Sequence, residues 1–343
     1  MNVLIVKLSS IGDVVHAIPA VAAIKRHRPD ARISWMVEKG SAELLRNAPI
    51  VDDLKIVDTK SIRGISNFPK AIAFLRRLRA ELLGGQFDIA IDMQGLMKSA
   101  VMAKISGATK IFGFETSQLR ESFASFVIDH QIEIPAKTNI IHKNMILAGA
   151  ACDFDPTVSP VEFPIELDEN EKLRVSEIVE GFGKEFVLLN PAGGWPTKLW
   201  SPERFGTLAD LIHERLGLLP VIVTGPGEDG LAEIVRQSSQ TGALRHLKTD
   251  LRTFFGVSAY SELYVGGDTG PTHIAAAARA PIVGIFGPTE WWRNGSLNDK
   301  DISVERKDIG CRTDCHRRSC SNWICMEISV EDVFSAVERR IGR

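Results

Sequence analysis

Gly266-Gly267-Asp268-Thr269-Gly270-Pro271-Thr272-His273 is the stretch around which the predicted fold is built. A short apolar strand is predicted to end at Val265, and the small residues over 274–280 favour a helix. This order of strand, glycine-rich turn and helix directs backbone N–H groups and the positive helix end toward an anion. Since the next strand is predicted over 281–286, we expect a phosphate-bearing ligand at the carboxyl edge of a parallel sheet. An ordinary turn with glycine chosen for positive φ is the alternative for this stretch taken alone.

The composition indicates a globular protein. Its 343 residues are enough for two domains of ordinary size, and 44% hydrophobic with 24% charged residues allow a large core. The net charge is −2, but basic residues are in excess in the first half of the chain and acidic residues in the second. A basic first half suits an anionic partner. Because no stretch has the pattern of a signal peptide or a membrane span, the expected compartment is the cytoplasm.

The first forty residues are predicted to form a strand, a loop, a helix and a second strand. The apolar run Val3 to Val6 is typical of a strand buried on both faces. The helix is predicted over 14–28, where Pro19 either begins the regular part or kinks it. The second strand is predicted over 32–37. The loop between the first strand and the helix therefore lies where doubly wound folds bind their ligands.

Asp13 ends that loop. A carboxylate at the start of a helix is an ordinary N-cap, and this interpretation stays open. The functional alternative is a general base held at the end of the strand beside Lys7, Ser9 and Ser10.

Polar and basic residues also follow other predicted strands of the first half. Strands are predicted over 54–57, 87–92 and 110–114, and the residues of interest are Lys7, Gln94, Lys98 and Arg120. Each alone is an unremarkable loop residue, but together at one edge of a sheet they would form a pocket for an acid. The helix predicted over 67–83 is basic and amphipathic. A solvated face is its ordinary interpretation, and docking on a membrane surface is the second.

The pattern changes near residues 150–185, and we place the domain boundary between residues 165 and 166. Strands resume over 186–190 and 220–224, each followed by a glycine-rich loop. Lys198, in the first of these loops, could contact a phosphate oxygen. Glu228, in the second, could accept a hydrogen bond from a ribose hydroxyl; an acid favoured by the helix dipole is the alternative.

The glycine-rich loops exclude two common classes of nucleotide enzyme. None has Walker spacing, and no Gly-x-Gly-x-x-Gly opens the chain, so a kinase or a simple dinucleotide oxidoreductase is disfavoured. Nucleotide-type loops in the second half and acid-receiving loops in the first fit a transferase.

Four of the five cysteines are close together in the sequence. Cys311, Cys315, Cys320 and Cys325 surround His316, whereas Cys152 is alone. Reduced, packed thiols are the favoured interpretation in a cytosolic protein. Zn²⁺ at the four cysteines is the alternative, although their spacing lacks the usual C-x2-C pairs.

The chain resembles the lipopolysaccharide heptosyltransferases of glycosyltransferase family nine. Residues 3–16 resemble the amino-terminal motif of that family, and residues 267–273 resemble its donor motif. Residues 92–99 and 119–121 look most like the heptosyltransferase I branch, which adds the first heptose to Kdo on lipid A. Gly193-Gly194-Trp195 departs from that branch, which has a Thr pair there, and the cysteine cluster resembles other branches.

This resemblance implies a GT-B fold: two Rossmann-like domains, residues 1–165 for the acceptor and 166–328 for the ADP-sugar, facing a central cleft. The final helix, within residues 329–343, would pack on the first domain. The implied reaction is an inverting transfer from ADP-L-glycero-β-D-manno-heptose to Kdo that requires no metal or other cofactor. Asp13 would take the proton from the Kdo hydroxyl, and Lys198 would stabilise the departing ADP. The implied donor-binding residues are Gly193, Gly194, Glu228, Asp268, Thr269, Gly270 and His273; the acceptor-binding residues are Ser9, Ser10, Gly12, Gln94, Lys98 and Arg120.

The implied partners are ADP-heptose and Kdo-bearing lipid A, and no nucleic acid. The enzyme would contact the cytoplasmic face of the inner membrane transiently, as a peripheral protein. Three alternatives remain open. The first is heptosyltransferase II or another family-nine transferase with a different acceptor. The second is a sugar-nucleotide epimerase of the same fold, and the third is a nucleotide sensor or scaffold without activity.

Overall fold

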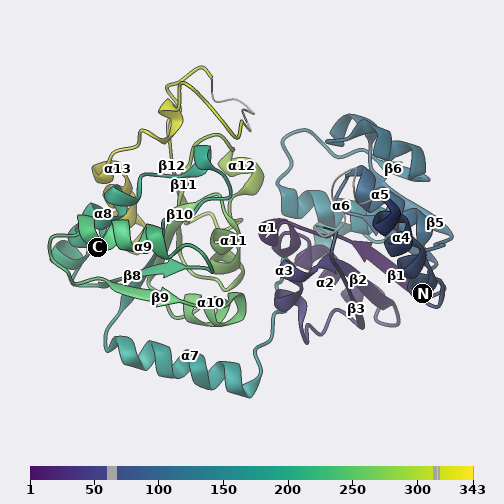
Figure 1. The fold of residues 1–343 in the computed structure, drawn as a ribbon, viewed down its shortest axis with the longest axis horizontal. Coiled ribbons are helices and arrows are strands. Elements are labelled where there is room, and N and C mark those ends of the chain that lie inside the picture. The colour runs from purple at the N-terminus through teal and green to yellow at the C-terminus, as the bar shows by residue number, and fades with distance from the viewer. Residues whose placement is uncertain (60–67, 312–314, 316, 343) are drawn as a thin grey trace. The chain divides into compact units, whose positions relative to one another are not determined.

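The computed structural model describes residues 1–59, 68–311, 315 and 317–342. The chain divides into two compact units, residues 1–166 and 167–343. Each unit is an α/β domain built on one parallel sheet (Figure 1). Among the described residues, no helix has both the length and the apolarity needed to cross a membrane.

The sheet of the first unit has six parallel strands in the order β3-β2-β1-β4-β5-β6. The strands are β1 (Asn2–Val6), β2 (Arg32–Glu38), β3 (Asp53–Val57), β4 (Ile89–Asp92), β5 (Lys110–Phe114) and β6 (His130–Ile132). The α-helices are α1 (Ile11–Val15), α2 (Ile18–His27), α3 (Lys39–Ala42), α4 (Phe68–Leu83), α5 (Met97–Ile105) and α6 (Ile140–Cys152). Short 3-10 turns are η1 (Glu43–Leu45), η3 (Thr116–Gln118), η4 (Ser122–Val127) and η5 (Pro156–Val158).

The sheet of the second unit also has six parallel strands, in the order β12-β11-β10-β7-β8-β9. The strands are β7 (Phe186–Asn190), β8 (Leu219–Thr224), β9 (Arg245–Lys248), β10 (Leu263–Gly267), β11 (Ile282–Phe286) and β12 (Ile302–Glu305). The α-helices are α7 (Glu169–Phe182), α8 (Pro202–Leu216), α9 (Asp229–Ser238), α10 (Leu251–Ser258), α11 (Gly270–Ala277), α12 (Trp291–Asn294) and α13 (Val330–Ile341). The 3-10 turns are η6 (Pro196–Lys198) and η7 (Ile324–Met326).

The two sheets share one topology, and it determines where a ligand can bind. In each unit the first strand pairs with the second on one side and with the fourth on the other. The strand order therefore reverses between β1 and β4 and again between β7 and β10. Ligands of doubly wound sheets bind at the carboxyl ends of the strands at such a reversal. The segments that follow these four strands contain Asp13, Gln94, Lys198 and Asp268, all singled out from the sequence.

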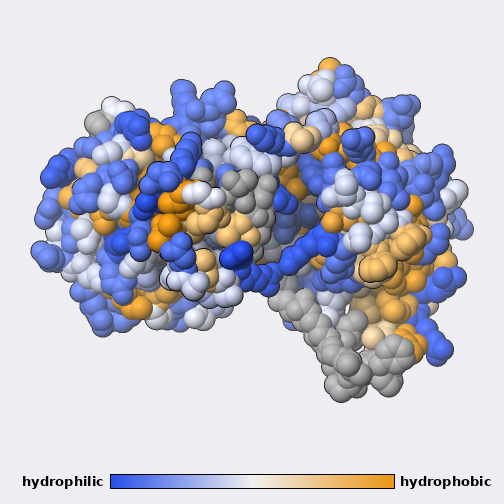
Figure 2. Space-filling view, turned by 90° about the horizontal axis from the view of Figure 1, so that it is seen from above, coloured by the Kyte–Doolittle hydropathy of each residue, from blue (hydrophilic) through white to orange (hydrophobic). Residues whose placement is uncertain are grey.

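The central strands are apolar because both faces of a parallel sheet are covered. Val3 to Val6 of β1 and Leu263 to Val265 of β10 are fully buried. Helix α4 uses Leu78 and Leu82 on its core side, whereas its basic residues are exposed, as the solvated-face interpretation requires. On the face that Figure 2 shows, hydrophilic residues are interspersed with groups of hydrophobic residues.

The structure differs from the sequence prediction at the first helix. One helix is predicted over 14–28, but the chain forms α1 and then α2. Pro19 lies in the first turn of α2, where its missing N–H and fixed φ are compatible with a helix start. Pro19 therefore begins the regular helix and does not kink it.

The final helix also differs from expectation. Helix α13 contacts α8 and strands β10, β11 and β12 of the second unit. Its buried side chains Val333, Phe334, Ala336 and Val337 belong to the hydrophobic core of that unit. The structure thus places in the second unit a helix that was expected on the first domain, because its apolar stripe is used there.

Candidate active site

Asp13 has the local environment expected of a reactive carboxylate. Ser10 is the N-cap of α1, and its backbone N–H and its hydroxyl donate to Asp13 Oδ2 at 2.9 and 2.8 Å. Both hydrogen bonds reach the same oxygen. The residue is half-buried, and it lies in the first turn of α1, beyond the carboxyl end of β1. The N-cap interpretation is therefore wrong in detail, because Ser10 is the N-cap and Asp13 is the third helical residue of a capping box, whose hydrogen bonds fix the orientation of its carboxylate.

Lys7 controls the charge at this position. Its side chain is buried, and Nζ donates to the carbonyl oxygen of Met93 at 2.7 Å. Burial lowers the pKa of Lys7, while the carboxylates of Asp13 and Asp92 oppose that shift. For Asp13, burial alone would raise the pKa, but the Lys7 ammonium, the Ser10 hydrogen bonds and His16 together hold the pKa below its usual value. Asp13 is therefore an anion at neutral pH, which is the form of a carboxyl group that can accept a proton.

Gln94 joins the loops after β1 and β4. Its side-chain oxygen accepts from the N–H groups of Leu8 and Ser9 at 2.9 and 3.1 Å. Gln94 thus orders the loop that leads to Ser10 and Asp13. The contact expected between Gln94 and an acceptor stays a prediction. Such a contact would use the amide nitrogen of the Gln94 side chain.

Asp92 is a buried carboxylate that sequence reasoning did not select as a site residue. It accepts from the N–H groups of Gln94 and Gly95 at 2.9 and 3.1 Å and from the Ser99 hydroxyl at 2.9 Å. Burial raises the pKa of Asp92 to about 6, despite these hydrogen bonds and the charge of Lys7. The sequence did offer an indication of its importance, because Asp92 is a charged residue at the end of an otherwise apolar strand. The role of Asp92 is to shape the loop after β4.

Lys98 and Arg120 differ in how much they are engaged within the protein. Lys98 Nζ lies 3.2 Å from the Thr59 hydroxyl and 3.5 Å from Glu38 Oε1, and Glu38 is buried. Arg120 is exposed. Its neighbour Glu121 accepts from the N–H of Met97 at 2.8 Å, which holds residues 120–121 beside the start of α5. Two cations of the first unit therefore lie near the loop after β4.

In the second unit, Asp268 is the centre of a buried polar cluster. Lys198 Nζ donates to Asp268 Oδ2 at 2.5 Å and to its carbonyl oxygen at 2.9 Å. His273 Nε2 lies 3.1 Å from Asp268 Oδ1, and Asn294 Nδ2 donates to Oδ2 at 3.1 Å. Burial opposes ionisation of Asp268, but the His273 hydrogen bond and the Lys198 charge hold its pKa well below the usual value. Asn294 was not selected as a site residue from the sequence. Its position shortly after the loop that follows β11 was the available indication that it could reach this cluster.

The turn after Asp268 has the geometry of an anion-binding helix start. Thr269 is the N-cap of α11 with an extended backbone, and its side chain makes no capping hydrogen bond. The Thr272 hydroxyl instead bonds the carbonyl oxygen of Gly267, and Tyr264 lies 3.1 Å from that hydroxyl. The side chain of Thr269 therefore caps no N–H of the first turn, and the helix dipole favours an anion there.

The remaining predicted donor residues lie in the loops after β7 and β8. A Cβ on Gly193 would lie 2.8 Å from Leu199 Cδ2, so a larger residue there would displace the Leu199 side chain, whereas the exposed Gly194 has open space around it. Trp195 places its ring centroid 3.9 Å from Lys198 Nζ. Glu228 accepts from the N–H of Gly225 at 2.7 Å and is the N-cap residue of α9. The structure therefore brings Lys198, Asp268 and His273 together, and leaves Glu228 in a loop-shaping interaction.

The cysteines are free thiols in the described structure. Cys311 and Cys320 are exposed, Cys315 and Cys325 are half-buried, and Cys152 is buried. Among the described side chains, no three His, Cys, Asp or Glu residues are arranged to hold a metal ion, and His316 lies outside the described residues.

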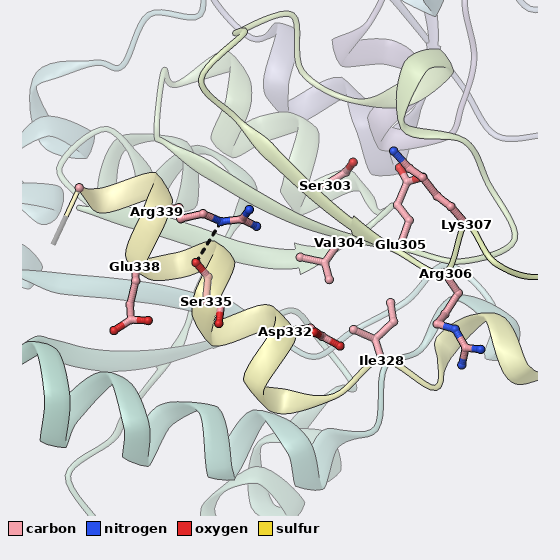
Figure 3. A pocket seen from close by; sticks show the side chains of 11 residues that line it. Ser303, Val304, Glu305, Arg306, Lys307, Ile328, Asp332, Ser335, Glu338 and Arg339 are labelled. Atoms are coloured by element: carbon pink, nitrogen blue, oxygen red, sulfur yellow. Dashed lines mark hydrogen bonds between the residues drawn. The ribbon is translucent and has the colours of Figure 1, made fainter.

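A hollow of about 1000 Å³ on the second unit lies apart from the predicted site residues. Figure 3 shows it between β12, the segment that follows, and α13. Its lining has charges of both signs, and Arg306 and Arg339 are engaged with Asp308 and the Ser335 carbonyl. None of the predicted donor or acceptor residues lines it.

Two Rossmann-like units with polar clusters at their switch points are the architecture of a GT-B glycosyltransferase. The match to a family model makes this specific: residues 75–323 fit glycosyltransferase family 9 (heptosyltransferase). The chain belongs to that family, and the expected fold class and enzyme class are confirmed.

Known relatives cover the whole chain. Lipopolysaccharide heptosyltransferase 1 of Campylobacter coli is 25% identical over 353 residues, covering 100% of this chain and 99% of that protein. The protein of the same name from Pseudomonas aeruginosa is 26% identical over 323 residues, covering 94% and 88%. Among solved structures, E. coli heptosyltransferase WaaC with ADP has a TM-score of 0.78 at 22% identity, covering 99% of this chain and 100% of that one. The fold similarity extends over both units.

Proposed function

We propose that this enzyme transfers L-glycero-D-manno-heptose from ADP-heptose to Kdo on lipid A, with inversion at the anomeric carbon. The observation that carries the proposal is the Asp13 carboxylate, held by Ser10 and kept ionised beside Lys7 at the end of β1. In one displacement the Kdo hydroxyl oxygen bonds to the anomeric carbon, its proton passes to Asp13, and the bond to the diphosphate breaks. The displacement needs one base and a stabilised leaving group, and no covalent nucleophile.

The donor is proposed to bind the second unit. Lys198 and the N–H groups at Thr269 and Gly270 would stabilise the charge of the departing ADP. Asp268 and His273 would contact heptose and phosphate, Glu228 would hold the ribose, and Gly193 with Gly194 would let the backbone approach the diphosphate. Two facts support this assignment: a relative of the same fold was solved with ADP, and the Asp268 cluster adjoins the uncapped start of α11.

The acceptor is proposed to bind the first unit. Lys98 and Arg120 would contact the carboxylate and phosphate of Kdo-bearing lipid A, and Ser9, Ser10, Gly12 and Gln94 would contact its polar groups. Lys98 would be shared between this acceptor and Glu38. The names of the two heptosyltransferase 1 relatives support an acceptor in the lipopolysaccharide core.

A lipid acceptor implies work at the cytoplasmic face of the inner membrane. Phe123 and Phe126, 68% and 83% exposed, follow Arg120 on η4, with ring centroids 6.1 Å apart. Exposed aromatic groups beside an exposed cation suit the boundary between lipid headgroups and acyl chains. We propose that this turn makes the transient membrane contact, in preference to helix α4.

The test is acceptor-dependent ADP release from ADP-heptose with Kdo-lipid A, comparing wild type with Asp13→Asn. We expect release to fall at least about 100-fold in the variant, the loss typical of a general base, while ADP binding is retained. Asp88→Asn is the control. Asp88 accepts the backbone N–H of Asn2 at the amino ends of the strands, whereas Asp13 follows the carboxyl end of β1. Unchanged turnover in Asp13→Asn would remove Asp13 from the mechanism. Release only with an already heptosylated acceptor would favour heptosyltransferase II.

A further inference from the structure

The loop that carries Lys198 is held by a segment much further along the chain. The hydroxyl of Thr197 donates to the carbonyl oxygen of Arg317 at 2.5 Å. The indole N–H of Trp323 donates to the carbonyl oxygen of Thr197 at 2.9 Å. Thr197 is therefore bound through both its side chain and its backbone, directly next to Lys198.

A third contact involves the ring of Trp195. The Arg318 guanidinium lies 5.5 Å from the ring centroid, and Lys198 Nζ lies 3.9 Å from it. Cations over an indole face are attracted by the electron density of the ring. Residues 317–326, which we call the strap, thus contact the Lys198 loop both at Trp195 and at Thr197.

The strap is itself anchored to the core of the second unit. The Arg204 guanidinium donates to the carbonyl oxygens of Met326 and Ile328 at 3.2 and 2.8 Å, and the Trp200 indole donates to Ile328 at 2.9 Å. Met326 is 5% exposed and belongs to the hydrophobic core. A segment fixed at this end can transmit its position to the loop it contacts.

The Lys198 loop is locally ordered over η6, where the N–H of Lys198 donates to the carbonyl oxygen of Trp195 at 3.0 Å, but the residues before it are less constrained. Gly194 precedes Trp195, and a side chain added there would meet nothing within 4 Å. Glycine has the largest backbone freedom of any residue, so the loop gains little order from this position. Lys198 nevertheless needs an exact position, because its side chain is 9% exposed and its ammonium bonds Asp268.

We propose that the strap is a positioning element for Lys198 and thereby determines the affinity of the enzyme for its nucleotide donor. The inference rests on the proposed function, in which Lys198 contacts the diphosphate. Thr197 and Trp323 are its positioning residues, because their hydrogen bonds hold the loop from which Lys198 extends.

The experiment is calorimetric titration of the full-length protein with ADP. Thr197→Val removes the hydroxyl at nearly constant volume, and we expect ADP to bind about 5-fold more weakly, the effect of one lost hydrogen bond. Thr197→Ser keeps the hydroxyl and should restore the affinity. The matched control is Ser261→Ala, which removes a hydroxyl that donates to the Ser258 carbonyl and is 7% exposed, at the amino end of β10. This control should lower the melting temperature without changing ADP affinity.

A second variant keeps the test valid if Thr197→Val folds poorly. Trp323 is 41% exposed, so Trp323→Phe removes its N–H with little loss of packing. We expect its KM for ADP-heptose to rise by a similar factor and its kcat to fall as well, because Lys198 would also stabilise the departing ADP. Equal ADP affinity in wild type, Thr197→Val and Trp323→Phe would overturn the positioning role and leave the donor assignment intact. Failure of the wild type to bind ADP would overturn both.

Discussion

Lys198 Nζ lies 2.5 Å from Asp268 Oδ2, and both side chains are more than nine-tenths buried. The pair joins the loop after β7 to the loop after β10, across the point where the strand order of the second sheet reverses. His273 and Asn294 occupy the remaining sides of the carboxylate. A diphosphate bound at this edge would share the Lys198 ammonium with Asp268.

Removing the carboxylate of this pair should destabilise the protein strongly. Asp268→Ala leaves the Lys198 ammonium buried without its ionic partner, and we expect a loss of about 3 kcal/mol in the free energy of unfolding. Urea denaturation followed by circular dichroism measures this loss. The control is Glu169→Ala, which breaks the exposed pair between Glu169 and Lys172 and should change stability little. A loss for Asp268→Ala no larger than that of the control would contradict the buried-pair interpretation.

The raised pKa of Asp92 should be visible in the pH dependence of stability. Its folded pKa of about 6 is above the usual value of 3.8, so the folded state holds this proton more tightly than the unfolded state. The stabilisation is complete below about pH 4 and is lost as the pH rises through 6, on the order of 3 kcal/mol for two pKa units. The unfolding free energy of the wild type minus that of Asp92→Asn should therefore decrease as the pH rises from about 4 through 6.

The difference curve isolates Asp92 because Asp13, Asp52 and Asp210 have lowered pKa values and act in the opposite direction in both proteins. Asp88→Asn again serves as the control, since Asp88 lies at the other edge of the sheet. A flat difference curve between pH 4 and 7 would show that Asp92 is ionised at its ordinary pKa in the folded protein.

The central strands and their loops were predictable from the sequence because they are apolar runs followed by glycine or polar residues. β5 and β7 have the predicted bounds, and α8 begins after Ser201 with Pro202 in its first turn. The edge strands β6, β9 and β12 were not predicted. They are three or four residues long and none is fully buried, so they lack the continuous apolar run that indicates a strand.

The partners of the site residues could not be read from local sequence. The exception is Lys7, which lowers the pKa of Asp13. These two residues are close in the sequence, so their interaction was foreseeable. Lys98 contacts Glu38 and Thr59 because β2, β3 and β4 end at the same edge. The contact between Thr197 and Trp323 spans 126 residues. Such contacts depend on topology, which local periodicity does not contain.

The charge of Lys7 should determine the acidic limit of the reaction. Lys7→Met replaces the buried ammonium with an apolar group of similar length, which removes the main influence that lowers the pKa of Asp13. The pKa of Asp13 should then rise, so the acid limb of the kcat–pH profile should move to higher pH. Lys25→Met is the control, because Lys25 pairs with Asp52 on the same unit without contact to Asp13. An unmoved acid limb in Lys7→Met would separate Lys7 from the base.

The thiols should differ in reactivity in an order that the structure determines. The thiolate is the reactive form, so a raised pKa and burial both slow alkylation. Burial raises the pKa of Cys152 to about 12, and burial followed by the neighbouring Cys315 thiol raises the pKa of Cys325. Cys311 and Cys320 are exposed. In iodoacetamide labelling at pH 8 followed by mass spectrometry, we expect Cys311 and Cys320 to react first, Cys325 later, and Cys152 only after unfolding. Labelling in urea, where all five should react alike, is the control, and early labelling of Cys325 in the folded protein would contradict its described environment.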